Sequence, residues 1–290
     1  MTEISCVLDW KAGTGESPVW SVQEQVLYWT DMPSKQLHRF DPATGLNTVT
    51  NLPEELCSFA LRKNGGIVAA MWTGFAFVDF ETGAVDFIHK LFKKGDDQRM
   101  NDGRCDRFGN FYAGSMDLRR KENTGVLYRL DPDLNLTEVC DNVMVSNGLA
   151  WTNDSTGMWW SDTFNQKLYH YDFDAKTGRP SNRRLILSYD DEMGRPDGAT
   201  VDEEGYYWTA CYRGGKIYRM DASGRIDRTV QMPVKNVTMC AFGGPDLSTL
   251  FVTTATDGMP PEQLAAEPWA GSLLAFEPGV RGVEEVKFSG

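Results

Sequence analysis

The sequence predicts a single all-β domain over residues 1–290, folded as a six-bladed β-propeller. One observation is a recurring unit of alternating apolar residues, an acidic residue and a turn, whose acidic residues fall at 41, 79, 131, 172, 221 and 277. A second is that the neighbouring segments also look like short strands, which gives four strands in each repeat. Six four-stranded repeats without helical periodicity are typical of a propeller.

The first two strands of each repeat are expected on either side of a glycine-containing turn. The innermost strands are expected in SPVWSV, FALRKNGG, GRCDRFG, GLAWTND, GATVDEEG and CAFGG. The second strands are expected in VLYWTD, GIVAAMW, NFYAGSM, MWWSDT, YYWTACY and TLFVTTA. Their apolar and aromatic content suits strands that are buried on both faces.

The third strands carry the repeated acidic turn. They are expected within residues 35–45, 74–83, 125–133, 167–178, 216–224 and 272–279. A fourth strand follows in segments such as LNTVTN, AVDFIHK, RRLILSY and RTVQMP. Helix is expected only as a turn or two in PPEQLAAEP at 260–268.

The chain ends must close the ring, because an open propeller would leave an exposed sheet edge. The terminal segments ISCVLDW and GVEEVKFS both have strand-like patterns, and we expect both to pack in the last blade. No shift in composition and no Gly/Ser linker indicates a second domain.

The charge balance excludes several classes of partner. Twenty-nine Lys and Arg residues stand against 41 Asp and Glu residues, for a net charge of −12, so we expect no nucleic-acid and no membrane partner. The first residues contain no apolar signal-like segment, which predicts a cytoplasmic protein, as a monomer or a small homo-oligomer. The sequence contains no CxxC pair, so neither a zinc ribbon nor a redox motif is indicated.

Polar residues recur at one register position of the innermost strands. Counting back four residues from the middle of each strand gives Glu16, Cys57, Asn101, Asn147, Asp197 and Thr238. The starts of innermost strands face one another around the central channel, so these side chains should converge. Any one of them alone could be a turn residue, but Glu16 is a poor turn former.

Glu16, Asn147 and Asp197 together offer two carboxylates and an amide oxygen. Such an all-oxygen set suits a hard divalent cation, which would also relieve the repulsion between crowded carboxylates. Other chemistries have little support, because no G-x-S-x-G or H-E-x-x-H motif occurs. The histidines at 38, 89 and 170 are expected on outer strands, away from the channel.

The segments GESPVW, RMNDGRCDRFGNFYAGSM, SNGL, PDGATVDEEGYYWTACYRGGKIYRMD and FGGPD resemble the gluconolactonase/regucalcin (senescence marker protein) family. The resemblance runs from about residue 6 to the C-terminus. It implies a six-bladed propeller that hydrolyses a sugar lactone with one divalent metal in the channel. The implied metal ligands are Glu16, Asn147 and Asp197, and the metal could be Ca²⁺, Zn²⁺, Mn²⁺, Mg²⁺ or Fe²⁺.

The same resemblance implies that Arg99 and Asn101 contact the sugar. After AGSM the chain departs from the family, where mammalian members carry a longer lid with a substrate-binding glutamate. That contact is either lost here or supplied by Asp117. Asp197 is the candidate general base, although it could instead be a ligand only.

The expected activity is therefore hydrolysis of a sugar lactone in carbohydrate catabolism, with the cation polarising the carbonyl and orienting water. One alternative is phosphotriester or aryl-ester hydrolysis at the same site, which predicts a wider and more apolar mouth. Another is a non-enzymatic calcium-binding propeller, which predicts metal affinity without turnover. The cationic run Arg119-Arg120-Lys121 either favours a lactone with an acidic group, such as a uronic or sulfonated sugar, or is a solvated loop.

Overall fold

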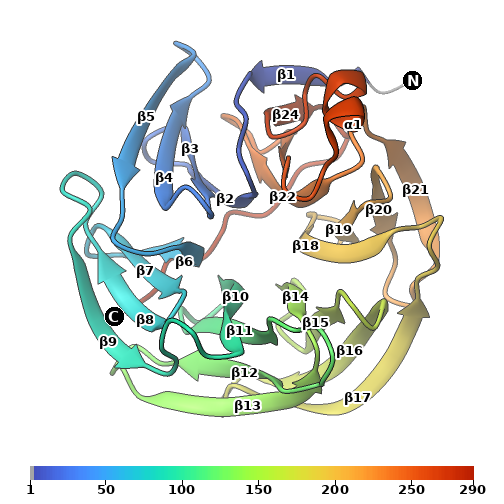
Figure 1. The fold of residues 1–290 in the computed structure, drawn as a ribbon. Coiled ribbons are helices and arrows are strands. Elements are labelled where there is room, and N and C mark those ends of the chain that lie inside the picture. Colours follow the sequence, from blue (N-terminus) through green and yellow to red (C-terminus); the bar gives the residue numbers. More distant parts are fainter. Residues whose placement is uncertain (1–2) are drawn as a thin grey trace.

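The computed structural model describes residues 3–290, which form six antiparallel four-stranded sheets arranged in a ring (Figure 1). Blades 1 to 3 contain β2 (Gly15–Ser21), β3 (Val26–Asp31), β4 (Gln36–Asp41) and β5 (Leu46–Asn51); β6 (Leu56–Leu61), β7 (Ile67–Met71), β8 (Gly74–Val78) and β9 (Val85–Lys90); and β10 (Gln98–Cys105), β11 (Phe111–Asp117), β12 (Gly125–Leu130) and β13 (Leu136–Val143). Blades 4 to 6 contain β14 (Ser146–Trp151), β15 (Gly157–Asp162), β16 (Lys167–Asp174) and β17 (Arg179–Ser188); β18 (Arg195–Val201), β19 (Tyr207–Tyr212), β20 (Lys216–Met220) and β21 (Ile226–Gln231); and β22 (Val237–Gly243), β23 (Thr249–Thr254), β24 (Leu273–Phe276) and β1 (Ser5–Leu8). The predicted six-bladed propeller is confirmed.

The burial of residues decreases from the innermost to the outermost strand of a blade. All residues of the inner strands β6, β14 and β22 are buried, whereas most residues of the outer strand β5 are exposed. Aromatic side chains fill the spaces between blades: Trp159 stacks on Tyr207 between blades 4 and 5, with ring centroids 5.0 Å apart. Trp20 and Phe251 stack between blades 1 and 6 at 5.6 Å. The hydrophobic core therefore consists of side chains packed between neighbouring sheets all around the ring.

The innermost strand of every blade contains one extra residue relative to the strand beside it. In β10, for example, Met100 pairs with Ser115 and Gly103 with Ala113, so three steps on β10 match two on β11. The other five innermost strands have their register shift near the same end. Such β-bulges bend the strand and redirect side chains.

The N-terminal segment closes the ring as expected. β1 pairs antiparallel with β24, with Ser5 opposite Ala275 and Cys6 opposite Leu274. The last blade is thus completed by the first strand of the chain, so β24 is not left with a free edge.

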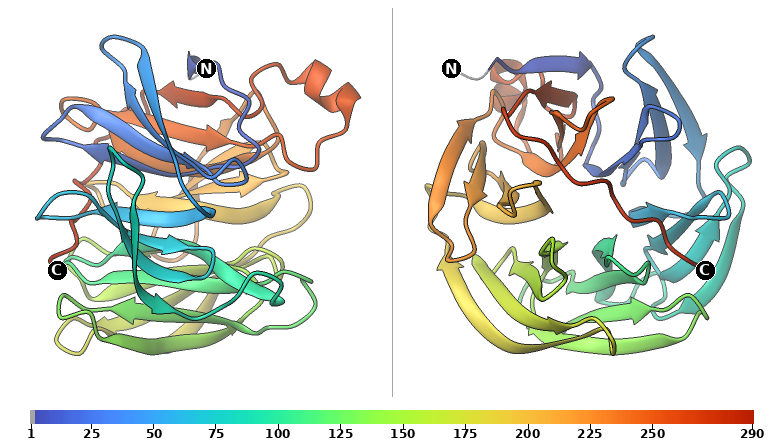
Figure 2. Two further views of the ribbon diagram at one scale, coloured as in Figure 1. Left: turned by 60° about the vertical axis from the view of Figure 1, so that its left-hand side comes forward. Right: turned by 180° about the vertical axis from the view of Figure 1, so that it is seen from behind.

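The C-terminal segment does not join the last blade, and that part of the prediction is wrong. It crosses the ring as an irregular strap (Figure 2, right). The backbone nitrogen of Phe288 donates to the carbonyl of Leu61 in blade 2, and that of Ser289 donates to Gly109 in blade 3. Blade 6 already has four strands once β1 is in place, so the segment finds other partners.

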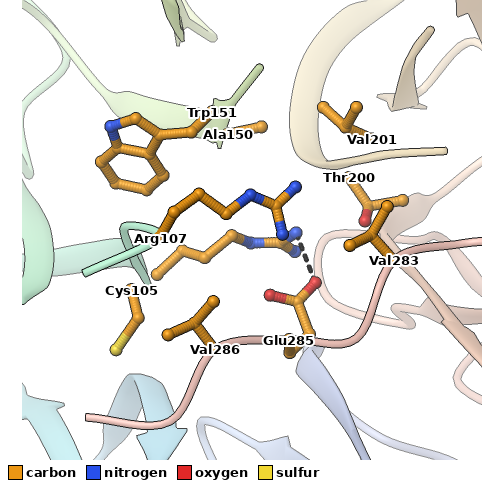
Figure 3. Close-up of a pocket in the computed structure, with 10 residues that line it drawn as sticks. Cys105, Arg107, Ala150, Trp151, Thr200, Val201, Val283, Glu285 and Val286 are labelled. Carbon is orange, nitrogen blue, oxygen red and sulfur yellow. Dashed lines mark hydrogen bonds and ion pairs between the residues drawn. The ribbon is translucent and has the colours of Figure 1, made fainter. Parts of the chain in front are cut away.

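The strap covers one end of the central channel. Figure 3 shows Glu285 beside Arg107 in a small pocket there, and Glu285 also forms an ion pair with Arg104 at 2.7 Å. The free volume of this pocket is about 20 Å³, close to the space of one water molecule. The strap therefore leaves little free space at this end of the channel.

The single helix among the described residues, α1 (Pro261–Ala266), confirms the helical turn expected at 260–268. It lies in the connection between β23 and β24 and projects from the side of the molecule opposite the C-terminus (Figure 2, left). No helix within residues 3–290 has the length and apolar character needed to span a membrane. The six cysteines are all free thiols.

Candidate active site

The six positions aligned from the repeats surround one cavity at the open end of the channel. Its volume is about 140 Å³. The cavity is lined by all six aligned residues, Glu16, Cys57, Asn101, Asn147, Asp197 and Thr238, and also by Arg99. Repeat alignment therefore located side chains that meet in space although they come from six different blades.

The bulges explain how these side chains reach the channel. Gly148, in the bulge after Asn147, has a φ of +58°, which glycine adopts without steric cost. A Cβ atom there would lie 2.5 Å from both Ser161 Oγ and the Tyr207 hydroxyl. The Tyr207 hydroxyl also donates a hydrogen bond of 2.8 Å to the Gly148 carbonyl. This close packing fixes the backbone that presents Asn147.

Asn147 and Asp197 are in direct contact. Asn147 Nδ2 donates to Asp197 Oδ1 at 2.6 Å and to Thr163 Oγ1 at 2.9 Å. Because both bonds use the amide nitrogen, Asn147 Oδ1 is left without a donor among residues 3–290 and can serve as a ligand in the cavity. Asn147 and Asp197 are 5% and 7% exposed, so the pair is largely shielded from solvent.

Acidic side chains are concentrated at this end of the channel. Burial raises the pKa of Asp197 well above its ordinary value, and the charges of Glu16 and Asp102 raise it further. The pKa of Glu16 is also raised, first by burial and then by Asp102. In both residues the carboxylate form is disfavoured by the protein alone, so a bound cation would stabilise it.

Asp102 is a cavity residue that the sequence reasoning missed. It is 5% exposed, lines the cavity, and accepts a hydrogen bond of 3.1 Å from the Leu149 backbone nitrogen through Oδ2. Its Oδ1 is buried without a hydrogen-bond partner among the described residues. Repeat alignment picks one residue per blade, but the bulge in β10 brings both Asn101 and Asp102 to the cavity. The acidic residue within MNDG was the available signal.

Arg99 and Asn101 form a second polar group beside the carboxylates. Arg99 Nη1 donates to Asn101 Oδ1 at 2.8 Å and to the Met100 carbonyl at 2.7 Å. Asn101 Nδ2 donates to the Ser146 carbonyl at 2.8 Å, which fixes the orientation of the amide. Arg99 Nη2 makes no hydrogen bond within residues 3–290, so it can donate to a ligand oxygen.

Asp117, the residue that could have replaced the family's substrate-binding glutamate if that contact is not lost, lies outside the cavity lining. The side chain is 1% exposed. Its Oδ1 accepts from the backbone nitrogen of Arg119, and its Oδ2 accepts from those of Lys121 and Glu122. The carboxylate therefore holds the loop after β11 in place, and both of its oxygens are engaged there.

The residues present fit a divalent cation. No group of three or more His, Cys, Asp and Glu side chains in the described part of the chain is arranged as a metal site, so the fit rests on a mixed set that includes an amide. Glu16 and Asp197 are carboxylates without an ion pair to a cationic side chain within residues 3–290, and Asn147 Oδ1 is free. Oxygen donors of this kind suit hard cations such as Ca²⁺ and Mg²⁺.

The chain is similar over most of its length to known proteins. The family model described as "SMP-30/Gluconolactonase/LRE-like region" matches residues 14–256. Among curated proteins, the chain is 38% identical over 288 residues to the 6-deoxy-6-sulfogluconolactonase of Pseudomonas putida, and 34% identical over 295 residues to the regucalcin of Homo sapiens, covering 99% of each chain.

Two solved structures have closely similar folds. One is the calcium-binding protein regucalcin from Agrobacterium tumefaciens, with a TM-score of 0.93 and 25% identity over 99% of this chain and 97% of that one. The other is a luciferin-regenerating enzyme, with a TM-score of 0.91 and 27% identity over the full length of both chains.

Proposed function

Because the chain belongs to the SMP-30/gluconolactonase/LRE-like family, we propose that it hydrolyses a sugar lactone to the corresponding sugar acid in carbohydrate catabolism, using one bound divalent cation. The observation that carries the proposal is the convergence of Glu16, Asn147 and Asp197 beside Arg99 and Asn101 in one cavity. A bare cation site would need only the first three residues. The second pair provides donors and acceptors for a substrate rich in hydroxyl groups.

Glu16, Asn147 and Asp197 would hold the cation through oxygen atoms. When bound, such an ion supplies Lewis-acid polarisation of the lactone carbonyl and lowers the pKa of water. Arg99 would donate through Nη2 to substrate oxygen, and its charge would favour negative charge that develops on the carbonyl oxygen. Asn101, held between Arg99 and Ser146, would position a sugar hydroxyl.

Asp197 is proposed as the base that takes a proton from the attacking water. One of its oxygens, Oδ1, is tied to Asn147, which leaves Oδ2 for the cation or for the proton. The reaction adds water across the acyl–oxygen bond: the hydroxyl joins the carbonyl carbon, and the ring oxygen leaves as an alcohol. The product acid loses its proton at neutral pH, so turnover can be followed as proton release.

The test is a proton-release assay on neutral and acidic aldonolactones, after chelation and after each of Ca²⁺, Zn²⁺, Mn²⁺, Mg²⁺ and Fe²⁺ is restored. Chelation should abolish turnover, and at least one metal should restore it. Asp197→Asn should lower kcat by about 10²–10⁴-fold if the residue is the base. Asp190→Asn, an exposed carboxylate in the connection between β17 and β18, is the matched control.

Two results would contradict the proposal. Turnover that resists chelation would remove the role of the cation, and full activity in Asp197→Asn would remove that of the carboxylate. Calorimetric metal binding without turnover of any lactone would favour a calcium-binding propeller instead. If the activity of Asp197→Asn recovers at high metal concentration, Asp197 is a metal ligand and not the base.

A further inference from the structure

Three arginine side chains gather at the mouth of the cavity. Arg120 lies in the loop between β11 and β12, Arg195 begins β18, and Arg213 lies in the turn between β19 and β20. The guanidinium carbons of Arg120 and Arg195 lie 4.6 and 4.4 Å from the ring centroid of Phe164. The guanidinium carbon of Arg213 lies 5.6 Å from the ring centroid of Tyr212.

This cluster adjoins the candidate active site. Arg120, Phe164 and Tyr212 line the same cavity as Glu16 and Asp197. Arg195 and Arg213 do not line the cavity themselves, but they contact Phe164 and Tyr212, which do. One end of the cavity is thus anionic and would hold the cation, whereas its mouth is cationic.

The three guanidinium groups form no ion pair with an acidic side chain within residues 3–290, although that of Arg213 interacts with the Tyr212 hydroxyl. Their neighbour Arg119 differs, because it pairs with Asp97 at 3.2 Å and with Asp117 at 3.7 Å. Three unpaired cations close together are costly unless a counter-ion joins them.

Two acidic side chains lie near enough to compete for this role. Asp191 acts on Arg195 through its charge, but Gln166 Nε2 donates to its Oδ1 at 3.4 Å, and it forms no ion pair with Arg195 within the described residues. Asp257 lines the cavity, with its backbone carbonyl facing the Tyr212 hydroxyl at 3.5 Å. The three arginines therefore keep free donors that point to an anionic ligand in a chain of net charge −12.

We propose that Arg120, Arg195 and Arg213 form a subsite for an anionic group carried by the lactone at the carbon farthest from its carbonyl. The inference rests on the proposed lactonase function and adds the class of substrate. Sulfonate, carboxylate and phosphate share the required chemistry, since each presents several oxygens to guanidinium donors. The lactone carbonyl would lie toward Glu16 and Asp197, and the anionic tail toward Phe164.

The sequence alone singled out the run Arg119-Arg120-Lys121, and the structure narrows it to one residue. Arg119 is engaged by two carboxylates, whereas Arg120 faces the cavity. Arg195 and Arg213 come from blade 5, and their sequence neighbours gave no sign of the cluster. The relative from Pseudomonas putida is named for a lactone with a sulfo group, which is consistent with an anionic substrate for this chain.

The test compares kcat/KM for glucono-δ-lactone with that for its counterparts bearing a terminal sulfonate, carboxylate or phosphate. The wild-type protein should prefer at least one anionic lactone, and raised salt should weaken the preference. Arg195→Gln and Arg213→Gln should each lower the anionic-to-neutral ratio about tenfold, mainly through KM, as expected for a lost charge-assisted contact. Arg195→Lys should restore part of the ratio.

Arg183→Gln is the matched control, because Arg183 also stacks on an aromatic ring, that of Tyr169, but lies on the outer strand β17. It should keep the wild-type ratio. An equal ratio in the wild type and in both cluster variants would overturn the inference while leaving the lactonase intact. If no lactone is turned over, calorimetry still decides: the terminally sulfonated sugar acid must bind more tightly than gluconate, and the difference must shrink in Arg213→Gln.

Discussion

His38 shows how a single buried side chain ties the stability of this fold to pH. The imidazole is fully buried on β4, stacked on Trp29 at 4.0 Å and edge-on to Trp10 at 5.1 Å. Its Nδ1 contacts Asn47 Nδ2 at 3.0 Å, and its Nε2 has no partner among residues 3–290. Burial lowers the pKa of His38 to about 4. The protein therefore holds this histidine in its neutral form.

A His38→Phe variant should reduce the acid sensitivity of the protein. Because the folded-state pKa lies below the unfolded value of about 6.5, the stabilisation is present above pH 6.5 and is lost as pH falls toward 4. The free energy of unfolding of the wild type should fall by up to about 3 kcal/mol across this window from His38 alone. Phenylalanine keeps the stacking but does not titrate, so the slope should flatten.

Denaturant unfolding at a series of pH values between 7 and 4 measures this slope. His89→Phe on the outer strand β9 controls for the replacement of one imidazole by a phenyl ring. If the free energy of unfolding falls equally with pH in the wild type and in His38→Phe, the lowered pKa of His38 is contradicted.

At the scale of single elements, the loop between β11 and β12 depends on one carboxylate. Asp117 accepts three backbone hydrogen bonds from Arg119, Lys121 and Glu122, at 3.1, 2.8 and 3.0 Å. The loop carries Arg120 to the cavity. Asp117 is therefore a positioning residue for the mouth of the cavity, and its contribution to activity would pass through the loop.

Asp117→Ala should loosen this loop. Loss of the buried acceptor should lower the free energy of unfolding by about 1–3 kcal/mol. Limited trypsin digestion should then cut faster at Arg119, Arg120 and Lys121. In the matched variant Asp131→Ala, the lost carboxylate accepts backbone bonds from Asp133 and Asn135 in the turn between β12 and β13, so digestion at residues 119–121 should stay at the wild-type rate. A raised KM with unaltered digestion would instead indicate direct contact with substrate.

The strands and loops that carry the site residues also show what could be predicted from the sequence. The repeat placed Glu16, Asn101, Asn147 and Asp197 at one register position, and strand geometry then required them to converge. It could not show that Asp117 would turn toward its own loop, because that choice depends on backbone nitrogens freed by the turn. Of the arginines at the mouth, only Arg120 lay within a run that the sequence singled out; Arg195 and Arg213 could not be predicted, since loops of different blades share no register.

Across the whole molecule, the strap was the element whose partner the sequence left undetermined. GVEEVKFS has the alternation of a strand, but alternation does not specify which edge a segment joins. β1 occupies the edge of the last blade, and the strap instead buries Phe288 between blades 2 and 3. Phe288 is fully buried, and its ring centroid lies 6.3 Å from that of Phe77.

Phe288→Ala should lower the free energy of unfolding by about 3–5 kcal/mol, the usual cost of truncating a buried phenylalanine. Phe108→Ala provides the comparison, because Phe108 is 53% exposed and its truncation should change stability by less than about 0.5 kcal/mol. Chemical denaturation of both variants measures the difference. Equal stabilities would show that the strap contributes little to the fold.

The position of the two chain ends has a consequence for how the protein is made. The strand that completes blade 6, β1, is synthesised before all the other strands, whereas its partner β24 is synthesised after them. Blades can form one by one during translation, but the ring can be sealed only after β24 has been made. Until then β1 has no partner, so a stalled or truncated chain would present an open edge to other molecules.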